Sequence, residues 1–255
     1  MLDEKSPTGV IGSKLRRPGF QQIVEDLRAR IARSELAEHA SLPSERSLAE
    51  QFSVSRMTAR RALEALEAEG LVYSQDRRGR FVSPQRLQYD VSNMVSFVAD
   101  ARTKGSDLDI EIVAVGEVAA DVRLASLLEQ PVGVPIYEYT RLFRSGGHAI
   151  FIETECVLAD RFPGFLQHDL QQSTTRILET HYNSAAQTGD IVIRMRGVCE
   201  DEAKLLNISN NHAVILLEQV IRDQTAAPFC FGHQVWRGEM AEFSAHAIVT
   251  RKNHR

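Results

Sequence analysis

The first apolar pattern of the chain has the spacing of a helix. Phe20, Ile23, Val24, Leu27 and Ile31 follow one another at intervals of three, one, three and four residues, so they fall on one side of an α-helix. The residues between them are mostly polar or charged. The pattern predicts an amphipathic helix whose apolar side packs against another part of the chain.

Two further helical patterns follow, separated by a tight turn. Ser44 is a good N-cap residue, and Glu45 favours the positive start of a helix. Residues 53–55 are too few for anything but a turn, so Ser55 is placed to cap the second helix, which Gly70 ends. The two helices are expected to bury Leu48, Ala49 and Phe52, and Ala59, Ala62, Leu63 and Leu66.

Arginines dominate the outer side of the second helix and the residues after it. Arg56 and Arg60 are four residues apart and share one face near the helix start. Residues 71–73 and 81–82 are typical of two short strands around a turn at 77–80. One arginine pair alone is usually a solvated face. Here the caps, the turn, the helix and the hairpin occur together, and this combination predicts a module that places one helix in the DNA major groove and a basic hairpin beside it.

These motifs resemble the GntR family of bacterial transcription regulators over about residues 18–84. The resemblance rests on LPSER at 42–46, LAEQF at 48–52, VSRMT at 54–58, RRALEALEAEGL at 60–71 and RRGRFV at 77–82. It implies a winged helix-turn-helix, with family DNA contacts carried over onto Arg46, Arg56, Arg60 and Gly79. Arg77 and Arg80 stand where the family often has glycine and threonine, which makes this wing more basic and stiffer. The expected DNA-binding residues are Arg46, Ser55, Arg56, Thr58, Arg60, Arg61, Arg78, Gly79 and Arg80.

The second half of the chain alternates strand and helix patterns. In residues 107–119, Leu108, Ile110 and Ile112 recur with the period of two that indicates a strand. The expected strands are 107–119, 135–144, 149–158, 191–198, 213–222, 229–236 and 243–250, and the expected helices are 121–129, 173–182 and 201–206. The order predicts an α+β fold in which 243–250 closes one antiparallel sheet. The expected domains are 14–84 and 96–251, joined by a linker at 85–95.

A faint internal repeat runs through this half. Residues 139–153 lie on residues 219–233 when shifted by 80, with strand, turn and strand in the same order and a short helix before each copy. The pattern predicts two helix–hairpin units that share one sheet, with a cleft between sheet and helices. A chance match of two ordinary hairpins is the alternative.

Residues 96–250 resemble the UTRA effector-binding domain, a chorismate-lyase-like fold of the HutC subfamily of GntR regulators. The supporting residues are Ser96-Phe97, Arg141 with Glu153, the loop 161–164, Ser173, and the run Trp236-Arg237-Gly238-Glu239. The resemblance implies that a small acidic or phosphorylated metabolite binds there. Arg141 would hold the anion and Ser173 would donate hydrogen bonds. Glu153 would accept a hydrogen bond from a hydroxyl or amine of the ligand, and Trp236 would form one side of the pocket.

Other interpretations of these residues stay open. Arg141 and Glu153 could form a structural salt bridge within the sheet, and Trp236 could simply pack in the core. His148 lies in a turn, where solvation is expected. The repeat matches His233 to Glu153, so His233 could touch a ligand or be a core histidine.

Several departures from the family pattern bear on the ligand. Phe143, Val98, Thr175 and Cys230 stand where UTRA domains often have arginine, a hydroxyl residue, tyrosine and an acid. Most of these changes remove charge or polarity, which indicates a smaller or less polar ligand than an amino-sugar phosphate, still with one anionic group. The expected effector-binding residues are Ser96, Phe97, Arg141, Phe143, Glu153, Ser173, Thr175, Cys230, His233 and Trp236.

Charge and cysteine content narrow the classes of function. The 255 residues carry a net charge of −4. Residues 1–84 hold 14 Lys and Arg against 12 Asp and Glu, and the remainder 16 against 22, which suits a DNA reader joined to a domain that does not touch DNA. The three cysteines have neither disulfide nor zinc spacing, so buried thiols in a reducing cytoplasm are expected. We expect no metal, no cofactor, no membrane span and no signal peptide, and a mobile arm at 1–17.

Together these patterns predict a ligand-controlled transcription regulator, with repression relieved by the ligand as the commonest arrangement in the family. One recognition helix reaches only a few base pairs, so two half-sites and a homodimer are expected. The alternatives are an enzyme or a ligand-free dimerisation module in the second domain. No nucleophile–base pair or cofactor loop favours an enzyme. The chain is also too short for the aminotransferase-like branch of the family.

Overall fold

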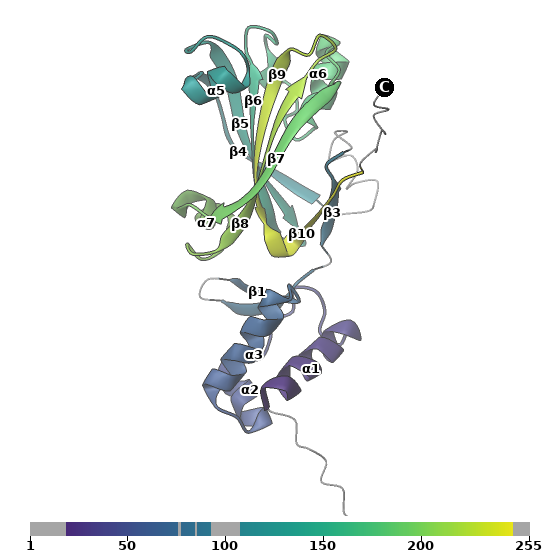
Figure 1. Ribbon diagram of the computed structural model, residues 1–255, viewed down its shortest axis with the longest axis vertical. Helices are drawn as coiled ribbons and strands as arrows, with labels where there is room; N and C mark the ends of the chain where they lie inside the picture. The colour runs from purple at the N-terminus through teal and green to yellow at the C-terminus, as the bar shows by residue number, and fades with distance from the viewer. Residues whose placement is uncertain (1–18, 76–77, 85, 93–107, 247–255) are drawn as a thin grey trace, which may run out of the picture.

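The N-terminal part of the computed structural model is a three-helix unit with a small hairpin (Figure 1). The structure describes residues 19–75, 78–84, 86–92 and 108–246. The elements of this half are α1 (Gly19–Ala32), α2 (Glu45–Phe52), α3 (Arg56–Ala68), β1 (Val72–Gln75) and β2 (Gly79–Val82). The apolar residues predicted to face inward line one core here, including Ile23, Leu48 and Leu63.

Local sequence signals position these helices. The Ser44 side chain accepts a hydrogen bond from the Ser47 amide at 3.1 Å, and Ser55 accepts one from the Thr58 amide at the same distance. Each bond satisfies one of the amides that a helix start leaves without a partner. Gly70 follows α3 with φ of 72°, a left-handed conformation that glycine adopts without steric cost. The predicted caps and the predicted helix end are confirmed.

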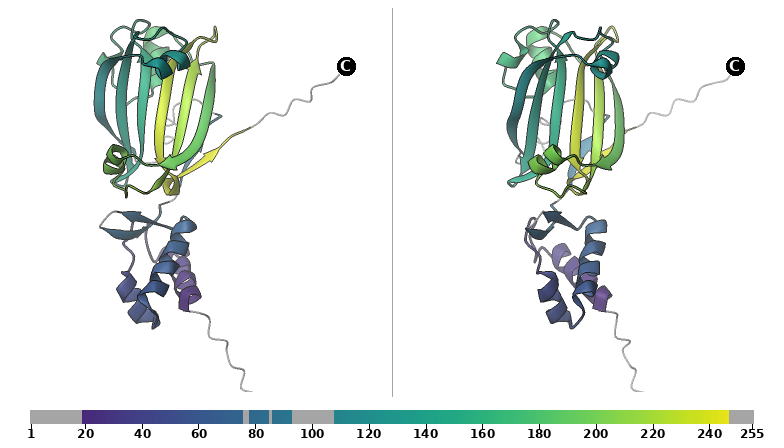
Figure 2. Two further views of the ribbon diagram at one scale, coloured as in Figure 1. Left: turned by 60° about the vertical axis from the view of Figure 1, so that its left-hand side comes forward. Right: turned by 90° about the vertical axis from the view of Figure 1, so that its left-hand side faces the viewer.

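A six-stranded antiparallel sheet forms the second half, in the order β4-β5-β6-β9-β8-β7. Its elements are β4 (Leu108–Ala119), α5 (Val122–Leu127), β5 (Pro135–Ser145), β6 (His148–Leu158), η1 (Phe165–Gln167), α6 (Thr174–Tyr182), β7 (Thr188–Gly197), α7 (Glu200–Leu206), β8 (Ala213–Arg222), β9 (Pro228–Arg237) and η2 (Gly238–Met240). The short helices α5 and α7 lie at opposite ends of one face of the sheet, and α6 lies over the other face (Figure 2). The predicted α+β class is confirmed.

The predicted repeat is visible in this topology. The units β4-α5-β5-β6 and β7-α7-β8-β9 have the same element order, and they meet where β6 pairs with β9. The register pairs Glu153 with Gln234 and Thr154 with His233. The shift of 80 residues therefore matches Glu153 to a residue on the other face, because a slip of one residue reverses the direction of every side chain in a strand.

The end of the chain departs from the prediction. Residues 243–250 were expected to close the main sheet, and residues 247–250 of that range lie outside the described residues. The strand that covers the start of the range, β10 (Ala241–Ser244), pairs in parallel with β3 (Leu87–Asp90) in a separate two-stranded sheet. The outer places of the main sheet are already taken by β4 and β7. The expected linker therefore contains a strand that the C-terminal segment holds in place.

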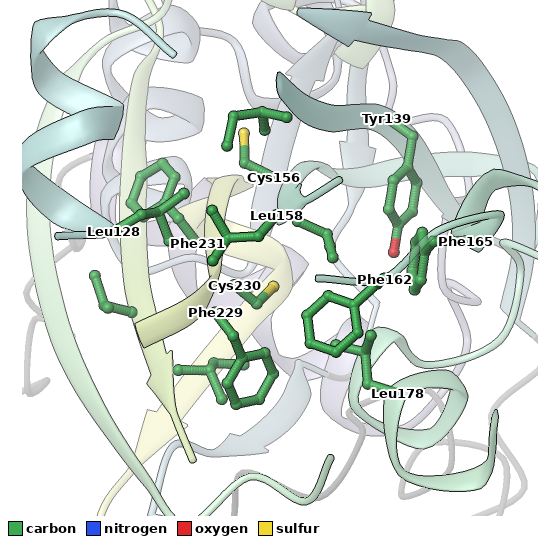
Figure 3. Close-up of a cluster of buried hydrophobic side chains, with 14 of the residues drawn as sticks. Leu128, Tyr139, Cys156, Leu158, Phe162, Phe165, Leu178, Phe229, Cys230 and Phe231 are labelled. Atoms are coloured by element: carbon green, nitrogen blue, oxygen red, sulfur yellow. The ribbon is translucent and has the colours of Figure 1, made fainter. Parts of the chain in front are cut away.

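Most of the effector domain's core lies between the sheet and the elements that cover it. One cluster joins Phe162, Phe165, Phe229 and Phe231 to Leu128 and Leu178, all of them buried (Figure 3). A second cluster contains Phe143, Phe151 and Trp236 of the sheet, and Tyr89 of β3. Tyr73 of β1 belongs to the second cluster as well, so the hairpin β1–β2 takes part in the core of the other domain.

Candidate DNA-binding surface and effector site

The start of α3 presents arginines to solvent. Arg56, Arg60 and Arg61 are exposed, and Arg60 Nε lies 3.0 Å from Glu64 Oε1. Neither Arg56 nor Arg61 forms an ion pair with another described residue. Their charges are therefore available to phosphates or base edges. Met57, next to Arg56 in the sequence, is 61% exposed, an apolar side chain at this surface that the sequence reasoning missed.

The side chains of Ser55 and Thr58 form the N-terminal cap of α3. Their hydroxyl oxygens lie 2.9 Å apart, and Ser55 also accepts the Thr58 amide proton. Both residues therefore fix the orientation of the helix start. Arg46 on α2 is exposed, with its Nε 4.0 Å from Glu50 Oε1.

Within the wing, the predicted DNA-binding residues have different surroundings. Arg78 and Gly79 are exposed, and Gly79 has φ of 105°. Arg80 is 17% exposed and contacts Glu45 Oε1 at 3.2 Å and Glu67 Oε2 at 3.3 Å. Arg80 thus ties β2 to α2 and α3. Its positive charge is already matched by two carboxylates.

A buried charged cluster lies on the α6 side of the sheet. Arg141 of β5 stands opposite Glu153 of β6 in the register, and the two side chains form a buried ion pair. Arg141 Nη1 donates to the carbonyl oxygens of Leu170 at 3.0 Å and Gln172 at 2.6 Å. The Nε–H of Arg141 is buried and has no hydrogen-bond partner among the described residues. The ion pair weighed for these two residues exists, and one donor of the guanidinium remains open.

Glu155 is a second buried carboxylate of this cluster, and the sequence reasoning missed it. It lies on the same face as Glu153, two residues along β6, and its Oε1 is 3.9 Å from Arg141 Nη2. The Cys230 thiol donates to its Oε2 at 3.0 Å. Burial and the neighbouring Glu153 raise the pKa of Glu155 to about 8. Burial also raises the pKa of the Cys230 thiol well above its usual range.

Hydrogen bonds lead from the ion pair to the only tryptophan. Gln234 Nε2 donates to Glu153 Oε1 at 2.7 Å, and Trp236 Nε1 donates to Gln234 Oε1 at 2.9 Å. The Trp236 ring stacks on Phe151 with centroids 3.7 Å apart, and Phe151 stacks on Phe143 at 4.0 Å. Trp236 is fully buried, as its core interpretation requires.

The start of α6 completes the described part of the site. Ser173 caps the helix by accepting the Arg176 amide proton at 3.5 Å, and its hydroxyl lies 2.8 Å from that of Thr175. The neighbouring Thr174 is buried, and its hydroxyl lies 2.6 Å from that of Tyr139. The structure thus brings Arg141, Phe143, Glu153, Ser173, Thr175, Cys230 and Trp236 to one face of the sheet.

Two of the singled-out histidines, His233 and His148, lie away from that group. His233 lies on the opposite face, where Glu218 and Arg196 are its charged neighbours, and burial lowers its pKa. Ser96 and Phe97 lie outside the described residues. His148 was expected to be solvated in its turn. It is instead half-buried and stacks on His39, because the DNA-binding domain packs against that turn.

The described part of the chain contains no group of three or more His, Cys, Asp or Glu that could hold a metal ion. It also contains no helix long and apolar enough to cross a membrane.

A capped helix-turn-helix with a basic outer face, joined to a separate sheet domain with a buried polar cluster, defines a DNA-binding regulator with a sensor domain. Family profiles match both parts. Residues 20–82 match the bacterial regulatory proteins of the gntR family, and residues 103–242 match the UTRA domain. The chain belongs to the GntR family of transcription regulators and carries a UTRA effector-binding domain.

Its relatives include named repressors. The chain is 27% identical to the repressor NagR of Bacillus subtilis, over 89% of this chain and 93% of NagR. It is 30% identical to the repressor PhnF of Mycolicibacterium smegmatis, over 83% and 85%. The crystal structure of PhnF from Mycobacterium smegmatis superimposes with a TM-score of 0.63 and 26% identity, covering 90% of this chain and all of that one.

Proposed function

We propose that this protein represses transcription by binding an operator as a homodimer, and that a small anionic metabolite in the UTRA domain releases it. The observation that carries the DNA-binding half is the start of α3, where a capped helix presents Arg56, Arg60 and Arg61 to solvent. NagR and PhnF are named as repressors, which supports the sign of the regulation.

Two substitutions test this docking on DNA. Arg60→Ala should cost roughly 1–3 kcal/mol of operator affinity and relax base preference, because Arg60 is placed to reach base edges. Arg78→Ala on the wing should weaken all sequences alike and reduce the slope of affinity against salt, because it is placed to reach phosphates. Fluorescence anisotropy with operator and scrambled duplexes at several salt concentrations measures both effects. Unchanged affinity in both variants would contradict the docking.

The ligand class is inferred from the buried cluster. Arg141 offers one open donor, its Nε–H, and the Ser173 and Thr175 hydroxyls lie at the start of α6. Glu153 already pairs with the single guanidinium, so the site suits a ligand with one anionic group and not one with a doubly charged phosphate. The relative MngR of Escherichia coli is named as a repressor of a mannosyl-D-glycerate transport and metabolism system, and glycerate carries a single carboxylate.

A thermal-shift screen tests that inference. Simple carboxylates should raise the midpoint of unfolding, because a ligand that binds only the folded state stabilises it. Arg141→Met should abolish the shift, whereas His233→Gln on the opposite face should keep it. Strong stabilisation by sugar phosphates and none by carboxylates would contradict the proposed ligand class.

The outer strands of the sheet support the homodimer. Both β4 and β7 expose large apolar side chains, among them Val115 at 49% and Met195 at 71%. Apolar side chains in such numbers at a sheet edge are typical of surfaces that another chain covers. Sedimentation equilibrium of the wild type and of Val115→Glu and Met195→Glu variants measures the oligomeric state and the edge that carries it. A monomer at micromolar concentration would contradict the proposal.

We infer a sensor and not an enzyme for the sheet domain, which acts where chromosomal DNA lies, in the cytoplasm. The thiol of the cluster is a poor nucleophile, because its raised pKa keeps it protonated at neutral pH. Incubation of the protein with each ligand that binds, followed by mass spectrometry, should return the ligand unchanged. Turnover of a bound ligand would favour the enzyme alternative.

A further inference from the structure

The DNA-binding wing is anchored in the effector domain by one tyrosine. Tyr73 lies on β1, yet its side chain is fully buried in the cluster that contains Phe143, Phe151 and Trp236. Figure 1 shows β1 at the boundary, directly below the sheet domain. The guanidinium of Arg237 lies over the Tyr73 ring, 4.8 Å from its centroid.

Arg237 is itself held rigidly. It is fully buried, and its Nε and Nη2 donate to Glu239 Oε1 at 3.0 and 2.9 Å. Its Nη1 donates to the carbonyl oxygen of Ala149 at 3.1 Å. The platform on which Tyr73 rests is therefore part of the effector domain, next in sequence to Trp236.

Two histidines close over the tyrosine hydroxyl, one from each domain. His39 precedes α2 and His148 begins β6, and their rings stack with centroids 3.7 Å apart at an angle of 5°. The Nδ1 atoms of His39 and His148 lie 2.8 and 3.2 Å from the Tyr73 hydroxyl. Gln75 Nε2 lies 3.3 Å from the same atom of His148.

The charged groups around this pair disfavour its protonation. His39 faces His148, Arg237 and the opposing charge of Glu38, and burial followed by His148 lowers its pKa to about 4. His148 faces Arg237 and Arg78, and burial followed by Arg237 lowers its pKa as well. Two protonated rings at stacking distance beside Arg237 would repel each other. The docked arrangement is consequently one of neutral imidazoles.

We propose that His39, Tyr73 and His148 form a latch that docks the DNA-binding wing on the effector domain, and that protonation of the two histidines opens it. The existence of the latch is inferred from the contacts among these three side chains. Only its effect on operator affinity rests on the proposed function. Glu153 of the effector site reaches this latch through Gln234, Trp236 and the adjoining Arg237. Binding of a ligand at that site can therefore change the position of the wing through the contacts of the latch.

The sign of the pH effect follows from linkage. The histidines bind protons more weakly when docked than when undocked, so docking is complete above the ordinary histidine pKa near 6.5 and is lost as the pH falls toward the lowered values. The opening equilibrium should rise by up to about tenfold per pH unit for each proton taken up. Lowering the pH from 7.5 to 5.5 should therefore raise it by about tenfold or more.

Hydrogen–deuterium exchange of the full chain tests the latch without a ligand. Exchange is measured at pH 7.5 and 5.5 and corrected for the intrinsic pH dependence of amide exchange. Peptides over 36–42, 72–75 and 146–150 should lose protection about tenfold at the lower pH, while β5 and β8 do not. Tyr73→Phe keeps the ring on Arg237 but removes the hydroxyl, so it should show the lower protection already at pH 7.5.

A second variant and a matched control complete the test. His148→Gln removes the stacked ring from the effector domain without disturbing the wing, and it should weaken the pH dependence, because only His39 is then left to take up a proton. His181→Gln breaks a second stacked histidine pair of the described residues, His168 with His181, and should behave as wild type. Protection that is independent of pH in the wild type, or wild-type behaviour of both latch variants, would overturn the proposal. Failure of every protein, wild type included, to bind DNA would instead count against the proposed function and leave the exchange result standing.

Discussion

At the scale of single residues, the buried ion pair is where a change should be most costly. Arg141→Met leaves the Glu153 carboxylate buried beside Glu155 without a counter-charge, so it should lower the free energy of unfolding by about 3–5 kcal/mol. Urea denaturation measures the loss. The double variant Arg141→Met, Glu153→Gln should recover part of it, and a loss as large as in the single variant would argue against an unpaired charge as the cause.

Two wing arginines should separate stability from DNA binding. Arg80→Ala should lower the unfolding free energy by about 1 kcal/mol, because Arg80 holds Glu45 and Glu67 in a partly buried position. Arg78→Ala should leave it unchanged, since Arg78 is exposed and has no ion-pair partner among the described residues. Thermal unfolding of the two variants and the wild type measures both changes. Equal losses of stability in the two variants would contradict the structural role of Arg80.

Glu155 should give the stability a characteristic pH dependence. Its pKa is raised from 4.5 to about 8 in the folded chain, so between these values the folded state binds a proton that the unfolded state does not. Stability from this group therefore falls as the pH rises from 4.5 to 8. Glu155→Gln imitates the protonated form and should flatten the slope, with the largest gain in stability near pH 8. Parallel wild-type and variant curves from urea denaturation would contradict the assignment.

Single residues were predictable where their role is local. Ser44, Ser55 and Ser173 cap the helices that follow them, because a cap depends only on residues within one turn. Glu155 and Gln234 were missed, because their importance arises from a strand register between distant segments. The same register explains His233: its place on the opposite face follows from a single residue of slip in the repeat.

At the scale of elements, the helix-turn-helix was readable because its pattern, caps and turn are contiguous. The pairing of β10 was not, since four residues carry little pattern and their pairing with β3 depends on the direction that the chain takes after η2. The repeat could be detected because the two units share the same order of strands, turns and helices, although few of their residues are identical.

The junction after α3 offers an element-scale prediction. Gly70→Ala should lower the unfolding free energy by about 1–2 kcal/mol, because Gly70 has φ of 72°, a left-handed conformation that is costly for alanine; the flexible Arg86 side chain, whose Nη2 is 2.1 Å from the added Cβ, can move away. Gly197→Ala is the matched control: nothing lies within 4 Å of its added Cβ. Differential scanning calorimetry of both variants gives the comparison. An unchanged midpoint for Gly70→Ala would show that the turn relaxes freely.

At the scale of the whole molecule, the two domains share one buried cluster instead of being joined by a free linker. Tyr73 of the wing lies in the same cluster as Trp236, and Tyr89 of β3 stacks on Trp236. The strand β10 pairs with β3, which lies between the two domains in the sequence. A change at the buried ion pair can reach the DNA-binding hairpin through such contacts. The sequence showed two domains and their charge contrast, but the contacts between them depend on packing that no local pattern encodes.

The most direct test of the central claim is selection of genomic fragments by the purified protein, at low salt and with metabolites removed. The account predicts that wild-type protein enriches specific fragments over random competitor DNA, and that Arg60→Ala binds those fragments roughly 5- to 150-fold more weakly, the equivalent of 1–3 kcal/mol. Equal retention of every fragment and of the competitor by the wild type would contradict it.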